Sequence, residues 1–195
     1  LRDDAIALTG PIRAAIEADR QHAVVARWVE GSIACRNFRP EYAFYAKREG
    51  ATAQGAIDAE RVFATVCTIG GDDGWFYANV LWWIRGAIDW LLGGPSFRRA
   101  RRHPTELRVG DVVDSWRVIA LEPGRRLTLL MEMKAPGAGV LEFVVQPQAM
   151  GASVSATAYW HPAGVWGLVY WYALIPAHAF IFRGLTRAII RRASR

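Results

Sequence analysis

The residue whose position most suggests chemistry is Asp114. It lies in strand-like sequence in which Val112 and Trp116 share its parity, so its carboxylate is expected on the apolar side of the strand. A carboxylate in such a place must find a partner there, which makes Asp114 a candidate polar anchor or general base. A structural pairing with an arginine, or with a tryptophan or tyrosine donor, is the more economical alternative.

Metal and nucleophile chemistry find little support in the sequence. The histidines lack the close spacings that hold transition metals, and the cysteines are too far apart for a zinc motif or a disulfide framework. No serine lies in a Gly-x-Ser-x-Gly elbow, and the acids in the glycine-rich loop at 70–74 would repel phosphate. We therefore expect no metal and no cofactor. These residues are His22, His103, His161, His178, Cys35 and Cys67.

The aromatic side chains predict a pocket. Nine tryptophans are an unusually large number for 195 residues. Such large rings pack poorly into a small solid interior. Aromatic walls with a few polar groups are typical of small-molecule pockets. Plain core packing is the simpler explanation for any single ring. The candidate ligand-binding residues are Tyr77, Trp82, Asp114, Trp116, Met131, Phe143, Trp160, Tyr170 and His178.

The positive charge of the chain suggests an anionic partner. The net charge of +6 comes almost wholly from arginines, which gather at 98–102 and 183–195. These clusters suit an anionic membrane surface, although a solvated helix end explains each more simply. We expect no nucleic-acid partner. Unpaired cysteines and an opening segment without the apolar core of a signal peptide favour a cytoplasmic location, with peripheral contact at the inner membrane face.

The first third of the chain predicts mainly helices. Residues 12–28 have helical periodicity and read as part of an N-terminal appendage or linker over 1–41. Alternating aromatic residues at 42–47 predict the first strand, and a polar, glycine-containing turn follows. Asp58 is placed to cap a helix at 61–68. A second helix is expected at about 75–92, with Arg85 and Asp89 paired on its outer side.

The remaining sequence predicts a meander and a covering helix. Strand-length runs at 112–121, 125–134, 140–147 and 152–160 are separated by proline- and glycine-rich turns. Their apolar faces need a cover, which the long helix at 165–192 supplies, with Pro176 inside it and an outer arginine stripe. The expected fold is α+β, with an antiparallel sheet wrapped around this helix and a single domain over 42–195.

Several motifs resemble a known family. They include Gly74-Trp75-Phe76-Tyr77, Arg85-Gly86 and Asp111-Val112-Val113-Asp114-Ser115-Trp116. They resemble a bacterial family of unknown function often found behind an NAD(P)-binding, short-chain-dehydrogenase-like domain. The order of elements resembles the START-like, helix-grip superfamily of polyketide cyclases and lipid-transfer domains. This resemblance covers residues 42–195 and implies a pocket for a hydrophobic ligand.

Three functions follow as hypotheses. The leading one is binding of a lipid- or polyketide-like molecule, with Asp114 and His178 as polar anchors. The second is a cyclase- or hydrolase-like enzyme using Asp114, or an accessory domain that partners an NAD(P)-binding domain; the chain itself lacks a Gly-x-Gly-x-x-Gly dinucleotide motif. The third is membrane association, because 165–182 is a charge-free run of about 18 residues; we expect this helix to pack on the sheet and not to span.

Overall fold

The computed structural model describes residues 46–94 and 101–195. Within these residues the fold is α+β, with one antiparallel sheet, and the predicted fold class is confirmed. The strands are β1 (Lys47–Gly55), β2 (Val112–Val113), β3 (Trp116–Glu122), β4 (Arg126–Met131), β5 (Gly137–Gln148) and β6 (Gly151–Pro162). The helices are α3 (Ala59–Cys67), the short 3-10 helix η2 (Gly71–Asp73), α4 (Asn79–Leu91) and α5 (Gly164–Ala193).

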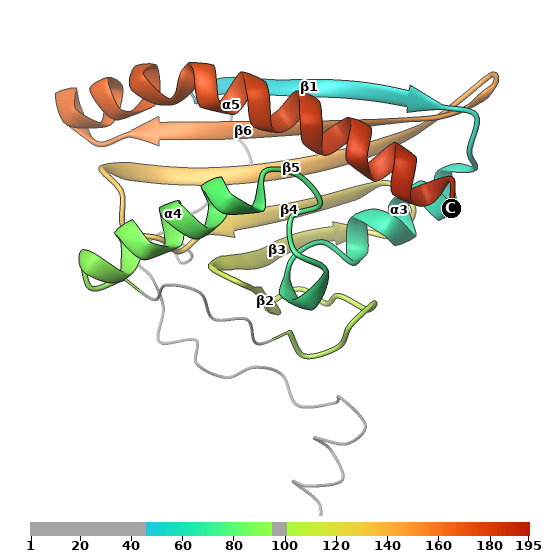
Figure 1. Cartoon of the computed structure of the whole chain (residues 1–195), viewed down its shortest axis with the longest axis horizontal. Helices are drawn as coiled ribbons and strands as arrows, with labels where there is room; N and C mark the ends of the chain where they lie inside the picture. Colours follow the sequence, from blue (N-terminus) through green and yellow to red (C-terminus); the bar gives the residue numbers. More distant parts are fainter. Residues whose placement is uncertain (1–45, 95–100) are drawn as a thin grey trace, which may run out of the picture.

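The order of the strands places the long helix α5 across one end of the sheet. The strands of the described residues pair in the order β1-β6-β5-β4-β3-β2, and every neighbouring pair is antiparallel. Helices α3, α4 and α5 lie on the same side of this sheet, and α5 crosses it over β1 and β6 (Figure 1). The long helix therefore covers the sheet as predicted.

The core lies between this face of the sheet and helices α3 and α5. Alternate residues of the central strands point inward, as the two-residue period of a strand requires. The last turns of α5 bury apolar residues while their arginines at 183, 187 and 191 are exposed, as predicted. The buried sheet residues are Leu127, Leu129, Leu141, Phe143 and Val145, and they face Val62, Phe63 and Val66 of α3 and Leu185 and Ile189 of α5.

The polar turn predicted after the first strand is wrong. The expected polar turn after Lys47 is itself the strand β1, which pairs with β6 along its whole length. The glycine that suggested a turn permits this pairing, since a Cβ on Gly50 would lie 2.5 Å from the carbonyl oxygen of Ala156. Residues 42–45, the predicted appendage and the boundary at 41/42 lie outside the described residues.

The second predicted helix also needs correction. It begins at Asn79, because Phe76 and Ala78 have φ values of 58° and 52°, which a right-handed helix excludes. Arg85 and Asp89 do approach each other, with 3.9 Å between the guanidinium and the carboxylate. Asp89 is fully buried and not on the outer side, and it accepts a hydrogen bond of 2.7 Å from the backbone N–H of Lys134.

The strand predicted at 112–121 is interrupted. Asp114 has φ of 54° and begins a turn that separates β2 from β3, so Val113 pairs with Trp116 across a hairpin. The parity argument for Asp114 assumed a continuous strand, and that assumption is wrong, although the carboxylate is buried. Asparagine and aspartate tolerate this left-handed conformation better than most residues.

Candidate ligand-binding cavity

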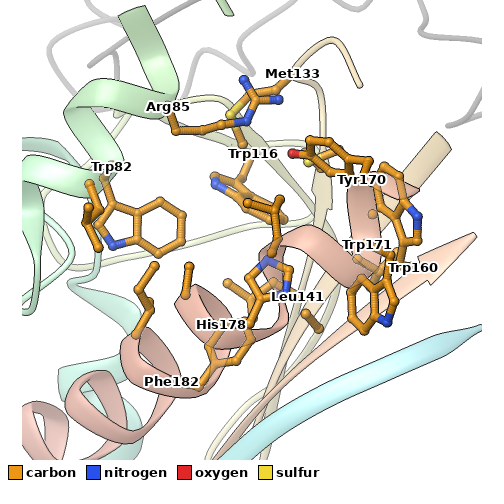
Figure 2. A pocket seen from close by; sticks show the side chains of 18 of the residues that line it. Trp82, Arg85, Trp116, Met133, Leu141, Trp160, Tyr170, Trp171, His178 and Phe182 are labelled. Atoms are coloured by element: carbon orange, nitrogen blue, oxygen red, sulfur yellow. The ribbon is translucent and has the colours of Figure 1, made fainter. Parts of the chain in front are cut away.

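An apolar cavity lies between the sheet, α4 and the first half of α5. Its volume is about 270 Å³, and nearly all of its wall is hydrocarbon or aromatic ring. Helix α4 contributes Leu81, Trp82, Ile84, Arg85 and Ile88 from one side, and α5 contributes residues between 170 and 182 from the other (Figure 2). The strands supply the floor. A cavity between the sheet and the C-terminal helix is what the sequence predicts.

Six of the nine candidate ligand-binding residues line this cavity. They are Trp82, Trp116, Met131, Trp160, Tyr170 and His178. The other three are Tyr77, Asp114 and Phe143. Phe143 is in the solid core, and Tyr77 packs against Phe180 with 5.3 Å between ring centroids and fills the space beside Gly184. That any of the six contacts a ligand stays a prediction.

Asp114 has a structural position. Its Oδ2 accepts a hydrogen bond of 2.9 Å from the indole of Trp75, and its Oδ1 accepts one of 3.3 Å from the backbone N–H of Gly71. A pairing with a tryptophan donor was the alternative explanation for this carboxylate. Trp75 in turn stacks on Trp82, with ring centroids 4.3 Å apart and planes at 18°. Asp114 therefore supports the cavity wall through Trp75 and does not line it.

Three polar atoms on the cavity wall lack a hydrogen-bond partner among the described residues. They are Nε1 of Trp82, one terminal nitrogen of Arg85 and Nδ1 of His178, and all three are shielded from solvent. The other terminal nitrogen of Arg85 donates to the carbonyl oxygen of Lys134 at 2.9 Å. Burial lowers the pKa of His178 from its ordinary value, so its imidazole is neutral near pH 7.

Sequence reasoning found Trp82 but missed Arg85 and the aliphatic residues Leu81, Ile84 and Ile88 of α4 as parts of the wall. Helix α4 is apolar around most of its circumference, so its periodicity does not indicate which face meets the sheet. The useful clue was Asp89, an acid in an apolar helix with a possible partner at i–4. Its burial orients the helix and places Arg85 at the cavity.

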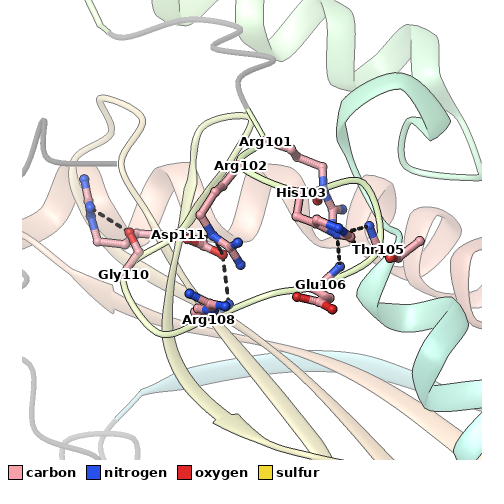
Figure 3. Close-up of polar contacts among 9 residues, drawn as sticks. Arg101, Arg102, His103, Thr105, Glu106, Arg108, Gly110 and Asp111 are labelled. Carbon is pink, nitrogen blue, oxygen red and sulfur yellow. Dashed lines mark hydrogen bonds and ion pairs between the residues drawn. The ribbon is translucent and has the colours of Figure 1, made fainter. Parts of the chain in front are cut away.

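The basic segment before β2 is part of the fold. Arg101 donates hydrogen bonds of 2.6 Å to the carbonyl oxygens of Cys67 and Ile69, where α3 ends. Arg102 forms an ion pair of 3.1 Å with Asp111, which also accepts from the backbone of Arg108 (Figure 3). These two arginines are therefore not a solvated face. Arg98 and Arg99 lie outside the described residues, and none of the described residues forms a cluster of three or more metal-ligating side chains.

Comparison with known families identifies the chain's own family. Residues 42–185 match the family described as "Protein of unknown function (DUF2867)". The chain belongs to this family. No curated protein matches it at a significant level. The expected neighbour, an NAD(P)-binding domain, stays a prediction.

Similar solved structures are distant. The Zhui aromatase/cyclase from a Streptomyces species is 15% identical with a TM-score of 0.46, over 77% of this chain and 94% of that chain. A protein from Rhodobacter sphaeroides is 14% identical with a TM-score of 0.46, over 75% and 91%. DynU16, from the dynemicin biosynthetic locus, is 12% identical with a TM-score of 0.47, over 75% and 47%. Similarity at this level assigns no activity.

Proposed function

We propose that the protein binds a hydrophobic small molecule in the cavity between the sheet, α4 and α5. The observation that carries the proposal is the cavity itself, about 270 Å³ with an almost wholly apolar wall. Close packing is the rule in protein interiors, so a void of this size needs an occupant or a functional reason. Ligand pockets have volumes of about 300 Å³ and more. This cavity is near the lower end of that range, which suits a compact lipid- or polyketide-like molecule.

The polar atoms of the wall narrow the ligand further. Trp82 offers an N–H donor, and the neutral imidazole of His178 offers a donor or an acceptor according to its tautomer. The positive charge of Arg85 already has Asp89 beside it. A ligand with one uncharged oxygen, such as a ketone or an alcohol, would satisfy these atoms. A carboxylate would enter without an unpaired cation to receive it.

The test uses three probes of similar shape: diphenylmethane, benzophenone and diphenylacetate. Binding is measured by titration calorimetry and by quenching of tryptophan fluorescence in the full chain. Benzophenone is expected to bind about threefold to tenfold more tightly than diphenylmethane, the usual net effect of one hydrogen bond. Diphenylacetate should bind most weakly. If none of the probes binds, ligand binding itself is refuted.

Two matched variants test the polar contacts. Trp82→Phe removes the indole donor while keeping a ring in the wall, and His178→Phe does the same for the imidazole. Either is expected to reduce the preference for benzophenone over diphenylmethane. Trp83→Phe is the control, because Trp83 lies next to Trp82 on α4 but is exposed. An unchanged preference in both cavity variants would contradict the polar contacts and leave apolar binding standing.

The enzyme hypothesis loses its first candidate. Asp114 does not line the cavity and accepts a hydrogen bond from Trp75, so a role as general base in this cavity would require it to leave that position. Mass spectrometry of the protein under native conditions would identify a co-purifying molecule. Recovery of that molecule unchanged after incubation supports binding, and its conversion to a product would favour the enzyme instead.

A further inference from the structure

Helix α4 exposes most of its apolar side chains. Trp83 is 59% exposed, Trp90 69% and Leu91 79%. Only Gly86 and Asp89 of this helix are buried. A helix of a soluble protein normally hides an apolar stripe and turns polar residues outward, so this arrangement is inverted. An exposed apolar surface of this kind marks an interaction site.

The first half of α5 has the same character. An apolar window of 18 residues within α5 has a mean hydropathy of 1.5, yet only 17% of it is buried. By length and composition α5 could cross a membrane. The core helix of a soluble protein can have the same length and composition, but it is mostly buried, whereas this window is not. The exposed residues include Val165, Trp166, Val169, Tyr172 and Phe180.

These two surfaces flank the same cavity. Leu81, Ile84 and Ile88 of α4 are exposed and also line the cavity, and α5 lines it from the opposite side. Figure 2 shows Trp82 from α4 facing His178 and Trp171 from α5 across the space between the helices. An apolar molecule that enters between α4 and α5 therefore passes the exposed apolar surface.

The charges favour an anionic partner. The charged residues of α4 are Arg85 and Asp89, and the carboxylate of Asp89 is buried. Residues 164–182 carry no charge, and the first charge after them is the exposed Arg183. Lys134 is exposed and its ammonium caps the carbonyl of Leu92 at the end of α4. A second copy of the chain, also at +6, would be repelled, whereas an anionic bilayer would be attracted.

We propose that α4 and the first half of α5 form a membrane-docking face, which rests on an anionic lipid bilayer with the cavity opening toward the hydrocarbon. Tryptophan and tyrosine are the residues that settle at a membrane interface, and this face carries Trp83, Trp90, Trp166 and Tyr172. The contact is made by apolar side chains, and basic residues assist it. The proposal does not depend on which ligand the cavity takes.

The helix α5 lies along the membrane and does not span it. Its first half is attached to the sheet, because the indole of Trp160 donates a hydrogen bond of 3.0 Å to the carbonyl oxygen of Gly167. Gly167 also lies so close to Pro136 that a Cβ there would be 2.4 Å from its carbonyl oxygen. The second half is buried against β1, β6 and α3. Spanning a bilayer would require both halves to leave the sheet.

The test is flotation of the full chain with vesicles of phosphatidylcholine, with and without phosphatidylglycerol. The docking variant carries Trp83→Ser, Trp90→Ser and Leu91→Ser, all at exposed positions. Its partition onto anionic vesicles is expected to fall about tenfold or more, since three large apolar contacts are lost. Met150→Ser is the matched control, because Met150 is exposed in the β5–β6 turn. A second control, Arg187→Gln with Arg191→Gln, removes charge from outside the face and should have the smaller effect.

The other occupants of the face appear as distinct outcomes. Equal vesicle binding by the docking variant and the wild type would overturn the proposal. So would a wild-type dimer, seen by light scattering, that the docking variant abolishes, because the face would then be an interface between copies. Release by high salt alone would assign the binding to arginines. Retention after a carbonate wash would show a spanning helix, whereas release by carbonate but not by salt supports docking.

Discussion

Helices α3 and α4 follow one another between β1 and β2, but they use their apolar residues in opposite ways. Helix α3 buries Val62, Phe63, Val66 and Cys67 and turns its polar residues to solvent. Helix α4 buries only Gly86 and Asp89 and exposes most of its large apolar residues. The first closes a solid core, and the second forms one wall of a cavity.

The difference lies in what holds each helix in place. Apolar burial stabilises α3, which also has a side-chain cap from Asp58 to the backbone of Glu60. Helix α4 has no side-chain cap, and polar contacts from Asp89 and Arg85 to the Lys134 region attach it. A helix attached at few points is the one that can move to admit a ligand.

The largest expected effect is a difference in the free energy of unfolding between substitutions in α3 and in α4. Phe63→Ala in α3 should lower the free energy of unfolding by about 3–5 kcal/mol, the range for buried aromatic truncations. Trp83→Ala in α4 should change it by less than about 0.5 kcal/mol, because this ring is exposed. Denaturant titration followed by circular dichroism measures both. A large loss of stability for Trp83→Ala would mean that another part of the protein covers this ring.

The next effect concerns the attachment of α4. Asp89→Ala removes the acceptor of the Lys134 N–H and the charge facing Arg85, at a cost of about 1.5–3 kcal/mol. Hydrogen exchange should accelerate in α4 and remain slow in α3. Asp89→Asn keeps an acceptor and should have an intermediate effect. Uniform acceleration across both helices would show that they unfold as one unit.

The fold could be predicted where one period dominates the sequence. The central strands alternate over long stretches, so their apolar face and the need for a covering helix are correct. The cap at Asp58 and the end of α3 before Gly70 were local patterns of the same reliable kind. The cavity was predictable in outline, because an open sheet around a long helix with many large rings leaves space.

The parts that were wrong depend on contacts between distant residues. The glycines of β1 suggested a turn, but Gly50 lies against β6 and Gly55 lies against Ile190 of α5. Asp114 lies in the two-residue β2–β3 hairpin with a left-handed φ, and its carboxylate accepts hydrogen bonds from Trp75 and Gly71, which lie 39 and 43 positions earlier in the sequence. The orientation of α4 depends on the buried Asp89. The hydrophobic periodicity of a sequence carries no information about such contacts between distant residues.

A smaller effect compares the starts of the two helices. Asp58→Ala should cost about 1 kcal/mol, because it leaves the N–H of Glu60 without its acceptor. Ala78→Gly, before α4, should instead stabilise by up to about 1 kcal/mol, since Ala78 has a left-handed φ of 52°. The two changes thus have opposite signs. Thermal unfolding measures them, and a destabilising Ala78→Gly would show that the conformation at this residue is not left-handed in solution.

The smallest expected effect concerns pH, and it distinguishes a titratable group in the core at α3 from one on the wall of the cavity. On α3, burial raises the pKa of Cys67 to about 11, so its thiol stays protonated at all ordinary pH values. Opposite α4, burial lowers the pKa of His178 below its ordinary 6.5. The folded protein therefore binds this proton less readily than the unfolded chain. The stability from the neutral imidazole is complete above pH 6.5 and is lost as the pH falls through the lower, folded pKa.

The lowered pKa of His178 predicts that ligand binding in the cavity depends on pH. As the pH falls through this lowered pKa, an imidazolium forms in an apolar wall. The affinity for benzophenone should therefore decrease on acidification, while His178→Phe should show a flat profile. Affinity is the better measurement than stability, because burial also lowers the pKa of His161 and would add to any loss of stability. The other titratable side chains on the cavity wall are those of Arg85, Tyr159 and Tyr170. An equal decrease in wild type and His178→Phe would place the titrating group elsewhere.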